Sequence, residues 1–274
     1  EEDPGNPYVG QVWYNETTGN LRVRQTTLTS AWATGGNMNT ARLNVAGSGI
    51  QTAALAFGGR VPPGSTYTAV TETYDGTSWT EVNDLNLARE QSAGFGANNT
   101  AAICAGGYLG DKTGNSETWN GTNWTETNNL NQNRYSLSAA GTSTAGLVFG
   151  GNGPSYTGKT ETYDGTSYTE VNDLNTIRQQ LAGAGTQTSA LAFGGEDPGN
   201  ARLGNTELWN GTNWAEVNNL NTARNELAGS GADNTASLAF GGNVPPASTV
   251  TELWNGSAWT EVNDLSMPRE KEGG

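Results

Sequence analysis

The stretch that decides the fold lies between residues 189 and 214, where Ser189-Ala-Leu-Ala-Phe-Gly-Gly195 is followed by Thr206-Glu-Leu-Trp-Asn-Gly-Thr-Asn-Trp214. An apolar run ends in a double glycine, and a second run ends in Asn-Gly. Asn-Gly favours tight hairpin turns because both residues accept positive φ. The preceding Leu181-Ala-Gly-Ala-Gly185 is made of small residues, which suits a strand in a crowded interior. Together these segments predict four successive antiparallel strands.

The same pattern recurs along the chain with a period near 45 residues. The double glycines are spaced 48, 44, 44 and 47 residues apart, at 58–59, 106–107, 150–151, 194–195 and 241–242. An aromatic residue keeps the same spacing at Trp32, Trp79, Trp124, Tyr168, Trp214 and Trp259, as does an arginine at Arg42, Arg89, Arg134, Arg178, Arg224 and Arg269. Four strands per repeat at this period are typical of a β-propeller blade. The sequence therefore predicts an all-β propeller of four-stranded blades.

The number of blades depends on how the chain ends are used. The sequence has five double glycines but six copies of the repeated aromatic residue and six of the repeated arginine. In addition, the patterns of residues 10–15, 20–25 and 31–34 predict three further strands. We expect residues 1–41 to complete a closing blade, 42–269 to form five complete repeats, and 270–274 to be a tail or the start of the closing inner strand. That organisation gives six blades and removes open sheet edges. The alternative is five blades with an N-terminal β-meander.

Two resemblances accompany the repeat. The apolar run, double glycine, aromatic and Trp of residues 42–269 resemble the kelch repeat, which implies a propeller and implies little about activity. Residues 10–32, with Gly10-Gln-Val-Trp-Tyr-Asn15, resemble a short module of bacteriophage tail-fibre and other virion proteins. Kelch-like arrays with Val82-Asn-Asp-Leu-Asn86 also resemble predicted structural proteins of marine phages. The resemblance implies a location on a virion surface or outside the cell.

Composition removes several classes of function. The chain has no histidine, so we expect no His-dependent catalysis, no metal site and no cofactor, and we predict that the protein is not an enzyme. With 13 Lys and Arg against 27 Asp and Glu, the net charge is −14, which disfavours a nucleic-acid partner. The apolar runs are too short for membrane insertion. The single cysteine, Cys104, aligns with small apolar residues of other repeats and is expected to be buried.

Repeated charges are expected to serve the scaffold. Each repeat places a Glu just before an aromatic residue and an Arg at a fixed position, as in Glu207 and Arg178. A catalytic residue is needed once, whereas these residues recur in every blade, so we interpret them as ion pairs. A ring of Arg that binds a polyanion is the alternative, although the surrounding carboxylates oppose it.

Candidate binding residues lie on the loops that connect the second and third strands of each repeat. These loops, called the variable loops below, differ in length and content, whereas the connections from one repeat to the next are nearly uniform. Variable loops on a rigid scaffold suit recognition by aromatic and polar side chains. The predicted ligand-binding residues are Arg60, Tyr67, Tyr108, Lys112, Tyr156, Lys159 and Arg202. The alternative is that these loops are tolerated insertions.

These observations predict a non-enzymatic propeller of a phage virion or tail fibre. Its variable loops would recognise a host-surface glycan or protein, or another virion protein. A carboxylate-dependent glycan-active enzyme is one alternative, because paired carboxylates do not require histidine. A purely structural decoration or assembly protein is the other.

Overall fold

The computed structural model describes residues 12–15, 20–23, 31–64, 66–245 and 247–270. Its described part contains strands and no helix, which confirms the all-β prediction. The chain divides into two compact units, residues 1–31 and residues 32–274. In the first unit, β1 (Val12–Asn15) pairs antiparallel with β2 (Asn20–Val23).

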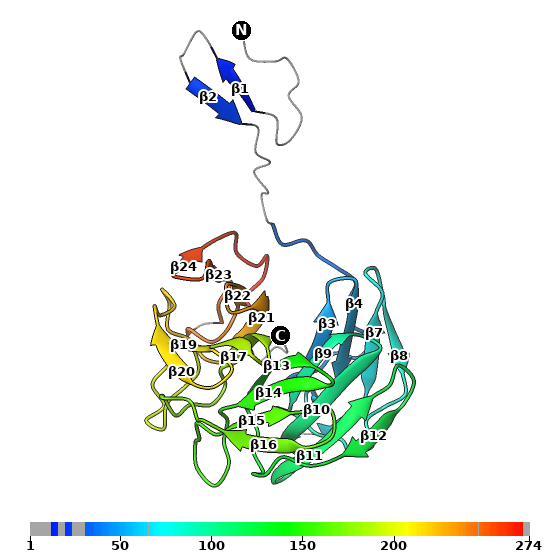
Figure 1. Cartoon of the computed structure of the whole chain (residues 1–274). Helices are drawn as coiled ribbons and strands as arrows, with labels where there is room; N and C mark the ends of the chain where they lie inside the picture. Colours follow the sequence, from blue (N-terminus) through cyan, green and yellow to red (C-terminus); the bar gives the residue numbers. More distant parts are fainter. Residues whose placement is uncertain (1–11, 16–19, 24–30, 65, 246, 271–274) are drawn as a thin grey trace. The chain divides into compact units, whose positions relative to one another are not determined.

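The second unit holds five four-stranded antiparallel sheets, which form the blades of a propeller (Figure 1). Blade 1 contains β3 (Ala46–Ile50), β4 (Ala53–Phe57), β7 (Thr71–Tyr74) and β8 (Trp79–Val82). Blade 2 contains β9 (Ala93–Asn98), β10 (Ala101–Tyr108), β11 (Lys112–Trp119) and β12 (Trp124–Thr127). Blade 3 contains β13 (Ser138–Thr142), β14 (Ala145–Phe149), β15 (Thr160–Tyr163) and β16 (Tyr168–Val171).

The last two blades repeat the same order. Blade 4 contains β17 (Ala182–Thr186), β18 (Ser189–Phe193), β19 (Thr206–Trp209) and β20 (Trp214–Val217). Blade 5 contains β21 (Ala228–Asp233), β22 (Ala236–Phe240), β23 (Thr251–Trp254) and β24 (Trp259–Glu261). A short hairpin of β5 (Arg60–Val61) and β6 (Thr66–Tyr67) lies in the variable loop of blade 1. The four strands per repeat were therefore predicted correctly.

The inner strands lie close together because they carry glycine and alanine. β17 contacts both β13 and β21, and its Gly183 faces Phe149 of the preceding blade. A Cβ atom on Gly183 would lie 2.4 Å from Phe149 Cζ, closer than any real contact. The glycine thus lets a buried aromatic ring of one blade reach the inner strand of the next.

Outer-strand tryptophans join neighbouring blades. Trp214 of blade 4 packs edge-on against Phe149 of blade 3, with ring centroids 5.0 Å apart. Its Nε1 donates a hydrogen bond of 3.1 Å to Thr160 Oγ1, also in blade 3. Trp124 and Trp259 make the same pair of contacts with the blades that precede theirs. The repeated aromatic is therefore a contact between blades.

Trp32 makes these same contacts with blade 5. Its ring lies 4.9 Å from that of Phe240, and its Nε1 donates to Thr251 Oγ1 at 3.1 Å. Farther along, the backbone N–H of Asn39 donates to Glu72 of blade 1. Residues 32–39 thus contact both blade 5 and blade 1, as a connection between consecutive blades does elsewhere.

The prediction of a sixth blade is wrong, and its five-bladed alternative is confirmed. The described residues form five four-stranded sheets, while β1 and β2 pair only with each other. Residues 31–34 form no strand, although Trp32 occupies the expected position between blades. A blade is held by backbone hydrogen bonds between strands, and side-chain contacts alone do not build one. Residues 271–274, expected to begin the closing inner strand, lie outside the described residues.

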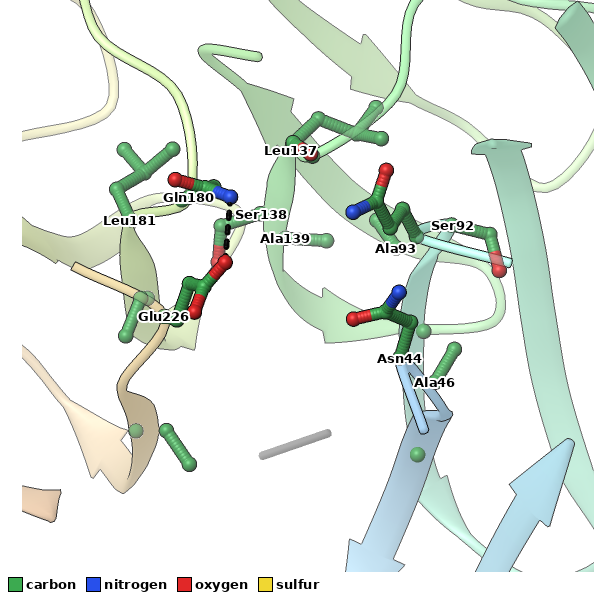
Figure 2. Close-up of a pocket in the computed structure, with 18 of the residues that line it drawn as sticks. Asn44, Ala46, Ser92, Ala93, Leu137, Ser138, Ala139, Gln180, Leu181 and Glu226 are labelled. Atoms are coloured by element: carbon green, nitrogen blue, oxygen red, sulfur yellow. Dashed lines mark hydrogen bonds between the residues drawn. The ribbon is translucent and has the colours of Figure 1, made fainter. Parts of the chain in front are cut away.

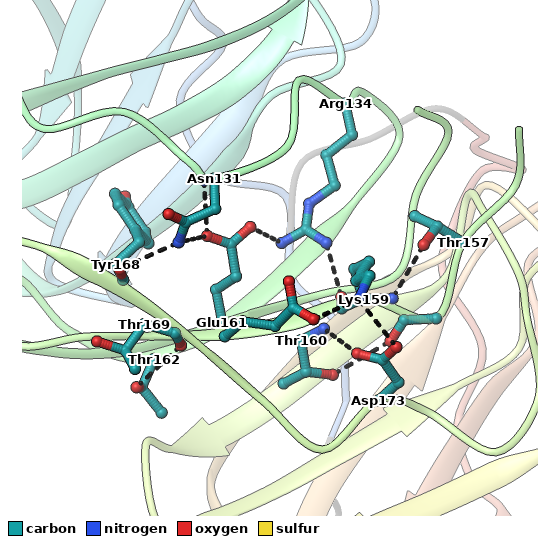
Figure 3. Close-up of polar contacts among 12 residues, drawn as sticks. Asn131, Arg134, Thr157, Lys159, Thr160, Glu161, Thr162, Tyr168, Thr169 and Asp173 are labelled. Carbon is teal, nitrogen blue, oxygen red and sulfur yellow. Dashed lines mark hydrogen bonds and ion pairs between the residues drawn. The ribbon is translucent and has the colours of Figure 1, made fainter. Parts of the chain in front are cut away.

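The repeated charges form buried ion pairs, as predicted. Arg134 Nη2 lies 2.9 Å from Glu161 Oε1, and both side chains are almost fully buried (Figure 3). The other Glu161 carboxylate oxygen accepts from the backbone N–H and the side-chain amide of Asn131. Equivalent pairs join Arg42 to Glu72, Arg89 to Glu117, Arg178 to Glu207 and Arg224 to Glu252. These residues connect each blade to the loop that enters it.

Hairpin turns of blades 1 and 3 provide a prediction about acid stability. Asp75 accepts two backbone hydrogen bonds, from Thr77 and Ser78, and these bonds lower its pKa below 3.8; Asp164 is held in the same way. A carboxyl group whose pKa is lower in the folded state stabilises the folded protein at pH values above the ordinary pKa of the group. This stabilisation is lost as the pH falls through the folded-state pKa. Asn fills the same turn position at 120, 210 and 255.

We therefore expect the double variant Asp75→Asn/Asp164→Asn to lose less stability on acidification than the native chain. Melting temperatures recorded from about pH 6 to about pH 3 measure this difference. Since Asn keeps the accepting oxygen, both proteins should behave alike near neutral pH. Parallel curves down to the lowest pH would contradict the prediction.

Candidate loop-face site

The double glycines turn each variable loop onto one face of the propeller. In blade 4, Gly194 and Gly195 have φ values of 66° and 102°, a region that glycine adopts without strain. Gly195 N–H donates to Arg224 O, and Glu196 then pairs with Gln179 across an isolated bridge. Each variable loop consequently lies beside the segment that enters its own blade. We call this surface the loop face.

A row of three tyrosines lies on the loop face. The ring of Tyr67, in β6, lies edge-on 6.0 Å from that of Tyr108, and Tyr108 lies 5.1 Å from Tyr135. All three side chains are half-buried. Partial burial raises the pKa of Tyr67, which keeps its hydroxyl protonated. The row therefore offers flat apolar faces together with hydroxyl groups.

Charged and amide groups border the tyrosine row. Arg60 Nε lies 3.5 Å from Glu90 Oε2, and Asn44 Nδ2 donates to the same oxygen at 2.6 Å. A groove of about 350 Å³ is lined by Tyr108 and Tyr135 together with Glu90, Gln91, Ser136, Gln179 and Gln180. It is a polar groove with aromatic walls.

Tyr156 lies in a separate hydrogen-bond network on the same face. Its hydroxyl donates to Glu196 Oε1 at 3.0 Å and accepts from Gln179 Nε2 at 2.8 Å. Burial is the main cause that raises the pKa of Tyr156, and the hydrogen bond to Glu196 raises this pKa further. Asn225 Nδ2 extends the network by donating to Glu196 Oε2 and to Gln180 Oε1, both at 2.9 Å. The network thus leads from a variable loop toward the centre of the propeller.

The three remaining predicted residues make contacts of other kinds. Lys159 is bound to Glu170 and Asp173 of its own blade, and the bond to Glu170 raises its pKa (Figure 3). Arg202 Nη2 donates to Asn243 Oδ1 at 2.7 Å, and Lys112 lies 3.6 Å from Asp111. The structure brings Arg60, Tyr67 and Tyr108 together and places Lys159 in a contact within one blade.

The central channel opens beside this groove. Its mouth is surrounded by one residue from each of the five segments that enter the blades: Asn44, Gln91, Ser136, Gln180 and Glu226. Four backbone hydrogen bonds of 2.9 to 3.2 Å link them in chain order, because the N–H groups of Gln91, Ser136, Gln180 and Glu226 each donate to the carbonyl of the preceding member of the set. We call these five residues the mouth ring. Below them, small residues such as Ala46, Ala93 and Ala139 line a cavity of about 140 Å³ (Figure 2).

Sequence reasoning missed Tyr135 and the mouth ring. These residues lie on connections between repeats, which the sequence analysis treated as uniform. The two positions after each repeated Arg are nevertheless variable: Leu43-Asn44, Glu90-Gln91, Tyr135-Ser136, Gln179-Gln180 and Asn225-Glu226. That variation is the signal that could have found them, by the same argument that identified the variable loops.

Comparison with known proteins identifies no relative from which a function could be inferred, so the fold and its loop face are the basis for the proposal below. No protein-family model matches the chain, and no curated protein matches it. In the described part of the chain, no three His, Cys, Asp or Glu side chains are grouped so that they could hold a metal ion. No helix long and apolar enough to cross a membrane occurs among the described residues. Cys104 is fully buried, as predicted.

Proposed function

We propose that this propeller is a non-enzymatic binding module that recognises a carbohydrate through its loop face. The observation that carries the proposal is the row of Tyr67, Tyr108 and Tyr135 beside a polar groove. Sugar rings have apolar faces that pack on aromatic rings, and their hydroxyl groups need donors and acceptors around them. The tyrosine row and the amides of Gln91, Gln179 and Gln180 supply both.

Binding without catalysis is supported by how the carboxylates of the loop face are held. Glu90 accepts from Asn44 and lies beside Arg60. Glu196 accepts from Tyr156, Gln179 and Asn225. A network of this kind fixes side-chain positions before a ligand arrives, which reduces the entropy lost on binding. We therefore propose recognition rather than bond cleavage.

We further propose that the module is displayed on a virion, as part of a tail fibre or another surface protein. The support is the resemblance of residues 10–32 and of the repeats to phage structural proteins. The proposed partners are a host-surface glycan and other virion proteins, outside the cell. A rigid propeller with five variable loops suits this role because the scaffold holds loop positions while loop sequences differ.

We expect Tyr108→Ala to reduce glycan binding up to about tenfold, because Tyr108 touches both other tyrosines and one aromatic contact is worth about 0.5–1.5 kcal/mol. Binding to an oligosaccharide array, followed by titration calorimetry on the strongest hit, measures the loss. Tyr108→Phe keeps the ring and should retain most of the affinity. Tyr74→Ala, which removes a half-buried tyrosine next to the hairpin turn of blade 1, is the control and should bind normally.

Three other outcomes would contradict the proposal. Equal binding by Tyr108→Ala and the native protein would remove the tyrosine row from recognition. Release of shortened sugars from the hit would indicate a glycan-active enzyme. Unchanged host binding with altered particle assembly, after Tyr67, Tyr108 and Tyr156 are all changed to Ala, would indicate a structural decoration protein.

A further inference from the structure

The junction between blade 5 and blade 1 differs from the other four junctions of the propeller. Each inner strand contacts the next one in chain order, from β3 through β9, β13 and β17 to β21. Among the described strands, no comparable contact joins β21 back to β3. The four backbone bonds of the mouth ring cross the same four junctions as the inner strands do. The interior of the ring is therefore packed least where its first and last blades meet.

The outer aromatic residues show the same difference. The outer-strand tryptophans of blades 2, 4 and 5 pack on the blade before their own, and each is only 5% exposed. Trp79, their equivalent in blade 1, is half-buried and stacks against Tyr74 of the same blade. Trp32 makes the contact with blade 5 in its place, and 38% of its surface is exposed. A residue outside the sheets thus makes the contact that an outer strand makes elsewhere.

Residues 32–39, called the strap below, cross this junction without forming a strand. One end of the strap is bound to blade 1 by several contacts. The backbone N–H and the side-chain amide of Asn39 donate to Glu72 Oε2 at 2.6 and 3.0 Å. A Cβ atom on Gly36 would lie 2.6 Å from Thr77 O, so the strap also packs closely on the hairpin turn of blade 1.

The other end of the strap is bound to blade 5 through Trp32. Its ring lies 4.9 Å from that of Phe240, and its Nε1 donates to Thr251 Oγ1 at 3.1 Å. Phe240 is half-buried, whereas the phenylalanines at the same position of blades 1, 3 and 4 are fully buried. One aromatic contact and one hydrogen bond between neutral groups each contribute little free energy. The attachment to blade 5 is therefore the weaker of the two.

From these observations we propose that the propeller opens and closes between blades 5 and 1, and that Trp32 makes the contact that closes it. When Trp32 leaves blade 5, the strap stays on blade 1 and the inner strands keep the other four junctions packed. Local opening of this kind occurs where few buried apolar contacts oppose it. Asn44 enters blade 1 and Glu226 enters blade 5, so opening moves two members of the mouth ring apart and widens the central channel.

Hydrogen exchange of indole N–H groups tests the opening within the native protein. The indoles of Trp32, Trp124, Trp214 and Trp259 make equivalent bonds, each donating to a threonine Oγ1 of a neighbouring blade at 3.0 to 3.1 Å. We expect the Trp32 indole to exchange at least tenfold faster than the other three in NMR spectra, because those three are released only by wider unfolding. Equal exchange rates for all four indoles would overturn the inference.

A distance measurement separates opening of the ring from release of the strap alone. Nitroxide labels in Thr80→Cys/Thr260→Cys report on blades 1 and 5, and labels in Thr169→Cys/Ala215→Cys report on blades 3 and 4. All four positions are exposed and directly follow the first residue of an outer strand. Cys104 is fully buried and therefore stays unlabelled. We expect a second, longer distance for the first pair and a single narrow distance for the second pair.

Variants of Trp32 then test its role in closing the ring. Trp32→Ala should raise the ratio of the longer to the shorter distance about tenfold in the first pair, since it removes the aromatic contact and the hydrogen bond. Trp32→Phe keeps a ring and should raise the ratio less, and both variants should leave the second pair unchanged. A single narrow distance for the first pair, even in Trp32→Ala and Trp32→Phe, would overturn the inference, because the ring would then stay closed when the strap is released.

The inference does not rest on the proposed carbohydrate binding, and one variant distinguishes the two. Tyr67 and Tyr108 belong to blades 1 and 2, and Tyr135 lies on the segment that enters blade 3. Tyr108→Ala should therefore weaken glycan binding and keep both native distance distributions. A longer distance in Tyr108→Ala equal to that of Trp32→Ala would show that Trp32 has no special role in closing the ring.

Discussion

Glu207→Gln is expected to lower the free energy of unfolding by about 3–5 kcal/mol, because it leaves Arg178 charged and buried without its partner. Arg178 Nη2 lies 3.0 Å from Glu207 Oε1, and neither side chain is exposed. Burial lowers the pKa of Arg178 to about 10, still well above neutral pH, so the guanidinium stays charged. Denaturant unfolding measures the loss, which corresponds to a melting temperature roughly 6–20 °C lower.

A matched control lies directly opposite in the sheet. Glu216 is the register partner of Glu207 on β20, but its side chain is exposed. Glu216→Gln removes the same charge and should cost less than about 1 kcal/mol. The double variant Arg178→Met/Glu207→Leu removes both charges and should recover part of the stability lost by Glu207→Gln. If Glu207→Gln and Glu216→Gln lower the free energy of unfolding by the same amount, the buried Arg178–Glu207 pair does not stabilise the propeller.

Gly183→Ala is expected to destabilise the propeller by about 1–3 kcal/mol through overpacking between blades 3 and 4. The added methyl group would lie 2.4 Å from Phe149 Cζ and 2.9 Å from Ser138 Oγ. Phe149 is fully buried and packs against Trp214, so its ring has no space into which it can move. Chemical denaturation of the variant measures this cost.

Two further variants test the cause of that loss. Gly64→Ala changes a glycine whose new Cβ would lie 3.7 Å from Thr66 Oγ1, the nearest atom beyond its chain neighbours, and it should be neutral or slightly stabilising. Phe149→Leu shortens the ring side chain, so in the Gly183→Ala background it should cost less than it does alone, a coupling of about 0.5–3 kcal/mol. Additive effects of the two substitutions would contradict a direct contact.

The parts of the molecule that sequence predicted well are those governed by local chemistry. Asp75-Gly76 and Asn210-Gly211 predict hairpin turns because the turn needs positive φ at glycine, and both glycines have it, at 96° and 92°. The double glycines end the second strand of blades 1, 3, 4 and 5 for the same reason, whereas Gly106 and Gly107 lie within β10. The Arg and Glu repeats implied ion pairs because a buried charge needs a partner, and each pair found here is buried.

The candidate site was only partly predictable. Tyr67 and Tyr108 were identified because their loops vary, yet Tyr135 completes their row from a segment 27 residues beyond Tyr108 in the sequence. Lys159 looked equivalent to Arg60 in sequence, but its ammonium group reaches Glu170 and Asp173. A long side chain such as that of Lys159 can turn toward the loop face or toward its own blade. The choice depends on neighbours that the fold brings close and that are not adjacent in sequence.

By itself, the amino-acid sequence determined the strand, the turn and the repeat, because backbone sterics and hydrophobic alternation act within a few residues. Only the tertiary structure decided the number of blades and the site at their centre. Trp32 carries the repeat pattern, yet residues 31–34 join no sheet, because a blade requires backbone partners that a side-chain pattern does not specify. The mouth ring likewise exists only once five blades bring five separate segments around one channel.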